Sequence, residues 1–172
     1  MESQKPSTGK FALTWGLIMG ITISTFSAIM YSMDLLLTQQ GASTIVGLII
    51  IIVCIVVGII QFKKANDGFL SIPEAIKIGI GAALISGVIS IAFQLILSHV
   101  IDPSLIEKTA AISRQAMEET GKYTEEQIQK GLDMQKKFAW ITYPIILIFN
   151  LFLGFVVAII TGAIMKKSEN NF

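Results

Sequence analysis

The sequence predicts an all-α integral membrane protein, a four-helix bundle with an extracytoplasmic helical hairpin between its third and fourth spans. Four runs contain no Asp, Glu, Lys or Arg, and each exceeds the roughly 20 residues that cross a bilayer core. They cover residues 11–33, 35–62, 78–101 and 138–165, so all 13 basic and 12 acidic residues fall outside them. The charged segment between the last two runs carries signals for the start of two helices.

Helices fit these runs better than strands. Backbone polar groups in lipid need internal partners, which leaves helices or a closed barrel. A barrel needs segments of about 10 residues that alternate in polarity, whereas residues 49–53 are Ile-Ile-Ile-Ile-Val. A soluble parallel sheet would need strands of about 4 to 8 residues, and residues 45–60 contain no breaker except Gly47 and Gly58. The hydrophobic fraction of 53% also exceeds that of ordinary soluble domains.

The predicted spans cover residues 11–33, 42–62, 76–99 and 138–165 of a single membrane domain, with the helical insert at residues 102–137. The first run is longer than the 7 to 15 apolar residues of a signal peptide, so we expect it to remain as an anchor. Cys54 is the only cysteine, which excludes a disulfide within the chain.

The lysines predict an orientation, because cytoplasmic flanks of spans are enriched in basic residues. The N-terminal tail, the second connection and the C-terminal tail carry lysines, whereas the first connection carries none. These lysines are Lys5, Lys10, Lys63, Lys64, Lys77, Lys166 and Lys167. We therefore expect a bacterial inner-membrane protein with both termini in the cytoplasm. The third connection holds six basic and seven acidic residues, but placing it inside would move three lysine-bearing flanks outside.

Capping signals predict the helices of the insert. Asp102 followed by Pro103 predicts an N-cap and a first helical residue, and Gly121 predicts the end of that helix. Thr124 and Gln127 have the spacing of a capping box that begins a second helix. We expect this second helix to continue without a break into the fourth span.

The insert has two interpretations. Pairs of opposite charge at i,i+4 favour a solvated helical hairpin that caps the bundle. The alternative is a cap that binds a partner through its apolar residues, which are Leu105, Ile106, Ala110 and Met117.

The second connection has a pattern of its own. Ser71 and Glu74 have capping-box spacing and predict the start of the third helix. The sequence Gly68-Phe69-Leu70-Ser71-Ile72 follows the basic end of the second span, Ala75-x-x-x-Gly79 comes next, and Ile101-Asp102-Pro103 closes the third span.

Together with the four-span layout and the long insert, these motifs resemble a bacterial membrane family known only as domain-of-unknown-function family 4199, found mainly in Bacteroidota. The resemblance covers nearly the whole chain. The chain differs from many relatives in having one glycine before Phe69, where they often have two. The resemblance implies no established activity.

Two polar side chains are predicted to lie deep in the membrane, Gln94 in the third span and Asn150 in the fourth. Such groups need hydrogen-bond partners in hydrocarbon, so they either join helices or line a polar pathway. The ionisable residues Asp34 and His99 fall near the predicted outer ends, where water is available.

Small residues recur at every fourth position in three spans. Such rows let helices approach closely in lipid, either within one chain or between chains. The rows are Gly16, Gly20 and Ser24; Gly79, Ala83 and Gly87; and Gly154, Ala158 and Gly162.

No enzyme motif occurs in the sequence: there is no His-Glu-x-x-His, Gly-x-Ser-x-Gly or phosphate-binding loop. We expect no catalytic residue, cofactor or metal, and the net charge of +1 does not favour nucleic acid. The leading hypothesis is a non-enzymatic accessory or scaffold protein that acts through its helix faces or its hairpin. The alternative is an oligomeric pore or transporter component that uses Gln94 and Asn150. Expected partners are the lipid bilayer and either further copies of the chain or another membrane protein.

Overall fold

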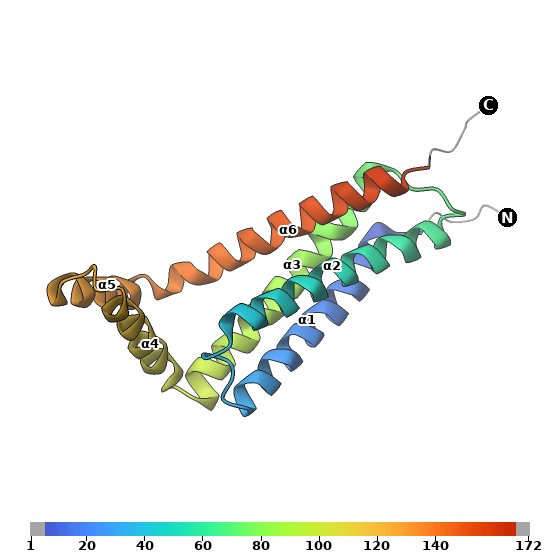
Figure 1. The fold of residues 1–172 in the computed structure, drawn as a ribbon. Helices are drawn as coiled ribbons and strands as arrows, with labels where there is room; N and C mark the ends of the chain where they lie inside the picture. The colour runs from blue at the N-terminus through green and yellow to red at the C-terminus, as the bar shows by residue number, and fades with distance from the viewer. Residues whose placement is uncertain (1–5, 168–172) are drawn as a thin grey trace. The chain divides into compact units, whose positions relative to one another are not determined.

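The computed structural model describes residues 6–167, and within them the chain is all-α, as the sequence predicts. Six α-helices follow one another along the described residues (Figure 1). They are α1 (Thr8–Ser32), α2 (Gln40–Ala65), α3 (Ile72–Ile96), α4 (Leu105–Glu119), α5 (Glu125–Lys137) and α6 (Thr142–Met165). A π-helical turn, η1 (Leu97–Ile101), follows α3, and a 3₁₀ turn, η2 (Ala139–Ile141), precedes α6.

Within the part of the chain that the structure describes, four helical stretches are long and apolar enough to cross a membrane, which indicates a membrane-spanning protein. They are Thr8–Ser32, Gln40–Ala65, Ile72–Ile101 and Ala139–Met165. The second stretch continues beyond its apolar run through Lys63 and Lys64. Positive charges in the last turn interact favourably with the helix dipole, so a lysine pair that ends an apolar run need not end the helix.

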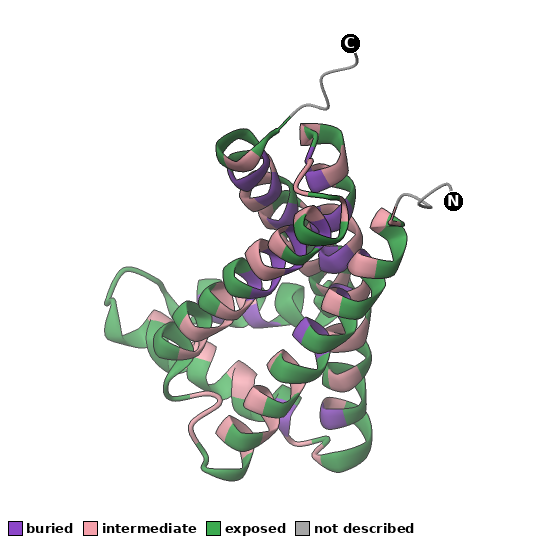
Figure 2. Ribbon diagram, turned by 90° about the vertical axis from the view of Figure 1, so that its right-hand side faces the viewer, coloured by how far each residue is buried: buried purple, intermediate pink, exposed green. Residues whose placement is uncertain are grey.

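The described residues form two compact units, residues 6–90 with 147–167, and residues 91–146. The first unit contains α1, α2 and most of α3 and α6. Its buried residues gather where these helices face one another (Figure 2). The apolar cluster at its centre consists of Met19, Ile51, Cys54, Ile55, Ile59, Phe62, Leu70, Ala75, Ile78, Ala82 and Ala158.

One end of the first unit is closed by polar contacts. The backbones of Leu70 and Lys167 pair as an isolated antiparallel bridge, with N–O distances of 3.1 and 2.9 Å. The Lys63 ammonium donates to the Met165 carbonyl at 2.7 Å, which gives a partner to one of the carbonyls left open at the end of α6. These contacts join the α2–α3 connection to the segment that follows α6.

The second unit contains the α4–α5 hairpin. Leu105, Ile128 and Leu132 are its buried apolar residues, together with Leu97 before it. The turn between the helices uses Gly121 at φ +61°, a conformation that favours glycine.

The predicted start of the first hairpin helix is wrong by two residues. Asp102 follows the π-turn, Pro103 lies in a turn, and α4 begins at Leu105. Asp102 accepts hydrogen bonds at Oδ1 from the backbone N (3.0 Å) and the hydroxyl of Ser104. Aspartate side chains form such local turns in competition with helix, which explains the later start.

The prediction that the second hairpin helix continues into the fourth span is also wrong. Helix α5 ends at Lys137, Phe138 leaves the helical conformation at φ −105° and ψ 13°, and α6 begins at Thr142. Within a continuous helix, the Pro144 ring would clash with the carbonyl of Trp140. Restarting at Thr142 puts the proline in the first turn, where an N–H has no partner within the helix.

Candidate functional site

Helices α3 and α6 meet along a seam of small residues. A Cβ built on Gly154 would lie 2.6 Å from the Ala83 Cβ and 2.8 Å from the Gly79 carbonyl oxygen. A Cβ on Gly79 would strike the Ala158 Cβ and come within 2.7 Å of the Gly154 carbonyl oxygen. The colliding atoms are backbone or Cβ atoms that cannot rotate away. Only glycine therefore permits this separation of the two helices.

The same seam extends in both directions. A Cβ on Gly162 would lie 2.8 Å from the Ala75 Cβ, and one on Gly87 would lie 2.7 Å from the Leu147 Cδ1. The rows of small residues on the third and fourth spans thus face each other within one chain.

Helix α3 also packs closely against α1. A Cβ on Gly16 would lie 2.8 Å from the Ile85 Cβ and 2.9 Å from the Ala82 carbonyl oxygen. A Cβ on Gly20 would lie 2.9 Å from Ile89 Cδ1. Helix α3 is therefore shared, with one face on α1 and another on α6.

Two further close approaches are not evident from the sequence pattern. A Cβ on Gly81 would lie 2.8 Å from the Ala12 Cβ, and one on Gly58 would lie 2.9 Å from Trp15 Cγ. Gly81 lies about 200° around α3 from Gly79, outside the row of small residues that Gly79 begins. Helix α3 thus carries a second small face, and the presence of both Gly79 and Gly81 was the available signal.

The two polar residues that the sequence predicts deep in the membrane lie in different units. Asn150, in the first unit, is half-buried on α6, and its Cβ is 3.9 Å from a Cβ built on Gly87. Gln94, in the second unit, is exposed, and its backbone carbonyl accepts from the Ser98 hydroxyl at 2.8 Å. Among the described residues, the buried hydroxyls of Ser24 and Ser86 make no hydrogen bond.

The π-turn at the end of α3 was not predicted. The Asp102 N–H bonds to the Leu97 carbonyl at 2.8 Å, a separation of five residues instead of four. His99 Nδ1 lies 3.2 Å from the Leu95 carbonyl oxygen and 2.9 Å from the Ser98 hydroxyl. Wider turns of this kind leave carbonyls for side chains to bind and occur often at functional sites. We find no sequence pattern that would have predicted this turn.

Arg114 joins the two helices of the hairpin. Its Nε donates to Glu118 on the same helix at 2.7 Å, and its Nη2 donates to Glu125 at the start of α5. The hydrogen bond to Glu118, and after it the contacts with Glu125, raise the pKa of the Arg114 guanidinium above its usual value. The guanidinium therefore stays charged and holds the hairpin at its turn.

The helix caps are formed by the following residues. At the start of α5, the Thr124 N–H donates to the Gln127 side chain at 2.9 Å and the Gln127 N–H donates to the Thr124 hydroxyl at 3.4 Å. At the start of α3, the Ser71 N–H donates to the Glu74 carboxylate at 2.8 Å and the Glu74 N–H to the Ser71 hydroxyl at 3.4 Å.

The outer surface of the hairpin differs from the predicted one. Leu105 is buried, and the Cε of Met117 lies 3.5 Å from a Cβ built on Gly131. Both side chains therefore pack within the hairpin instead of forming its outer surface. The large apolar side chains exposed on the two helices are Ile106, Ile112 and Met134.

Comparison with known proteins gives one match. The sequence profile of a family described as a protein of unknown function, DUF4199, matches residues 14–167. No curated protein and no solved structure matches the chain. The match agrees with the resemblance inferred from the motifs at the ends of the second and third spans.

Proposed function

This chain belongs to the DUF4199 family, and we propose from that premise that it is a multi-pass accessory or scaffold protein of the bacterial inner membrane. It acts without catalysis, by presenting the α4–α5 hairpin to a partner membrane protein outside the cytoplasm. The first unit is the anchor, in which the glycine seams give the helices one fixed arrangement.

The observation that carries this proposal is the composition of the hairpin surface. The hairpin is rich in charge, yet Ile106 and Met134 are 45% and 60% exposed. The contacts of Arg114 to both helices fix their relative placement at the turn. Methionine and arginine are enriched in protein–protein interfaces, so the exposed Met134 on a hairpin that Arg114 fixes supports a partner-binding role.

The proposed orientation, with both termini in the cytoplasm, is supported by contacts between lysine-bearing segments. The Lys63 ammonium binds the Met165 carbonyl, and Leu70 pairs with Lys167. The α2–α3 connection and the segment after α6 therefore share one end of the first unit. Basic residues that gather at one end favour a cytoplasmic location for that end.

Site-specific photocrosslinking in native membranes tests the scaffold role. A benzophenone side chain at Ile106 or Met134 is expected to give one discrete crosslinked band containing a second membrane protein. The control is the same side chain at Glu119, which is exposed on α4 and should give no such band. A protein that crosslinks equally from all three positions, or from none, contradicts the proposal.

A second candidate function, a pore or carrier component, is favoured by Gln94 alone. This amide is exposed on a helix long enough to span the membrane, and its side chain makes no hydrogen bond to other described residues. Replacing Gln94 with Leu should abolish ion or solute flux through reconstituted vesicles if an oligomer uses this amide. Unchanged flux, or no flux from the natural protein, excludes this role for Gln94.

A further inference from the structure

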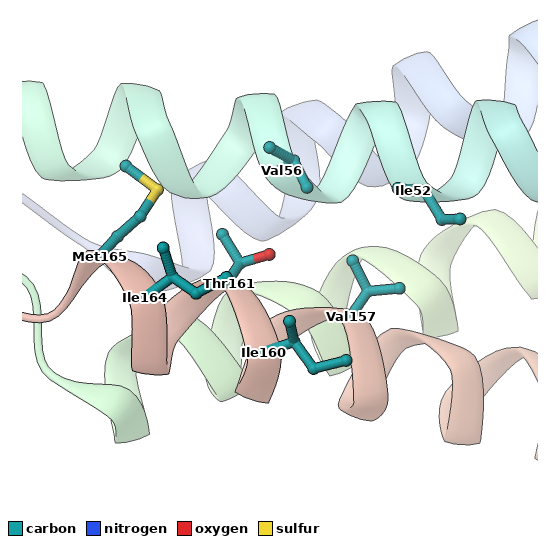
Figure 3. Close-up of a pocket in the computed structure, with 7 residues that line it drawn as sticks. All are labelled: Ile52, Val56, Val157, Ile160, Thr161, Ile164 and Met165. Atoms are coloured by element: carbon teal, nitrogen blue, oxygen red, sulfur yellow. The ribbon is translucent and has the colours of Figure 1, made fainter.

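An apolar groove of about 410 Å³ runs between α2 and α6 in the first unit (Figure 3). Its lining side chains come from one face of each helix, at spacings of three and four residues. They are Ile52, Val56, Val157, Ile160, Thr161, Ile164 and Met165. On α6 the lining extends along about 12 Å of helix axis. The groove is therefore an elongated slot parallel to the helices.

The groove exists because no close-packed glycine lies between α2 and α6. Gly16, Gly20 and Gly81 bring α1 and α3 together, and Gly79, Gly154 and Gly162 bring α3 and α6 together. Gly58 of α2 lies against Trp15 of α1. Helices α2 and α6 meet through branched side chains, which keep the two backbones apart.

One end of the groove is basic. Met165 lines that end, and its carbonyl accepts from the Lys63 ammonium at 2.7 Å. Lys64 follows Lys63 on α2, and Lys166 and Lys167 follow Met165; these three are exposed. The Lys167 ammonium also lies 5.5 Å from the centre of the Phe69 ring.

The charge of the groove is strongly asymmetric. Residues 35–62 and 138–165 contain no charged residue, so the far end near Ile52 has none on either lining helix. At the basic end there are two nearby acids, Asp67 in the α2–α3 connection and Glu74 in the first turn of α3. The backbone N–H and the hydroxyl of Ser71 both donate to the Glu74 carboxylate. An apolar slot with ammonium groups at one end is complementary to an amphiphile with an anionic head.

We propose that this groove binds one acyl chain of an anionic glycerophospholipid, with its phosphate held by Lys64 and Lys166 beside Lys63. Lysine ammonium groups bind phosphate as compact point charges. Basic pockets between spanning helices on the cytoplasmic side are suited to anionic lipid head groups. The lipid belongs to the leaflet that the lysines face, and it fills the space that the glycine seams leave between α2 and α6.

Native mass spectrometry of the full chain, released from detergent, tests this site. The probes are phosphatidylglycerol and phosphatidylethanolamine with identical acyl chains. One phosphatidylglycerol is expected to bind more tightly than phosphatidylethanolamine, and the double variant Lys64→Gln/Lys166→Gln should weaken it by about ten-fold or more. The matched control, Lys122→Gln/Lys136→Gln, removes two exposed hairpin lysines and should keep the preference.

A second pair of variants tests the groove itself with all lysines present. Ile160→Trp places an indole into the groove and should remove the tight phosphatidylglycerol. Ile148→Trp, on an exposed position of α6 that does not line the groove, should leave it bound. Equal affinity for the two lipids, equal effects of a variant and its control, or a protein dimer that excludes lipid from the Ile160 site would overturn the proposal.

Discussion

Gly79 and Gly154 lie directly opposite each other across the contact between α3 and α6. A Cβ built on Gly79 would lie 2.7 Å from the Gly154 carbonyl oxygen, and a Cβ built on Gly154 would lie 2.8 Å from the Gly79 carbonyl oxygen. This reciprocal fit means that neither position accepts a side chain without a shift of both backbones. The α3–α6 contact therefore requires glycine at both positions.

Overpacking this contact should destabilise the protein. Ala158 is fully buried beside Gly79, so Ala158→Leu must push α3 and α6 apart, and we expect a loss of about 1 to 3 kcal/mol of stability. The measurement is thermal unfolding in detergent. Ile148→Leu, at an exposed position of the same helix, serves as the control and should be nearly neutral. Equal shifts in the two melting temperatures would mean that the seam carries no packing constraint.

A pair of glycine substitutions separates close packing from helix propensity. Glycine in a helix interior is worse than alanine by roughly 0.5 to 1 kcal/mol. A Cβ added to Gly47 would meet only open space, so Gly47→Ala should raise stability by that amount. Gly81→Ala would place a methyl 2.8 Å from the Ala12 Cβ and should lower it. Both variants are scored by thermal unfolding in the same detergent, and stabilisation by Gly81→Ala would show that α1 and α3 are loosely packed.

Cysteine labelling tests the proposed topology. In a Cys54→Ala background, single cysteines replace Ala42, Ala111 and Lys166, all of which are exposed. An impermeant thiol reagent added to cells with a permeabilised outer membrane should label positions 42 and 111 and leave 166 unlabelled until the inner membrane is opened. Labelling of position 166 with protection of position 111 would indicate the opposite orientation, with both termini outside the cytoplasm. Ser168, a natural choice for the C-terminal probe, lies outside the described residues.

Removal of the hairpin should leave the membrane unit folded. The seam contacts of Gly79, Gly154 and Gly162 all lie within the first unit, so they do not need residues 103–136. Replacing Pro103 to Lys136 with a short Gly/Ser linker is expected to give a protein that remains inserted and resists proteolysis as the full chain does. Failure to insert, or rapid degradation, would assign the hairpin a structural role instead of a binding one.

The sequence by itself determined that the chain is helical and has four apolar helices long enough to cross a membrane. It could do so because a charged residue at the centre of a bilayer is costly, so the spans are visible as uncharged runs along the chain. The N-terminal cap of α5 could also be predicted from the sequence, because Thr124 and Gln127 bind each other's backbone within one turn.

Only the tertiary structure decided which small residues oppose one another. Lipid tails are as apolar as the spans, so hydrophobicity does not distinguish a helix face that meets lipid from one that meets a helix. Gly81 against Ala12 and Gly58 against Trp15 depend on residues far apart in the sequence. The π-turn before Asp102 was likewise visible only in the structure, because it depends on which carbonyl the Asp102 N–H reaches, here that of Leu97. The break at Phe138 fits Pro144, which has no N–H to donate and does not fit the interior of a continuous helix.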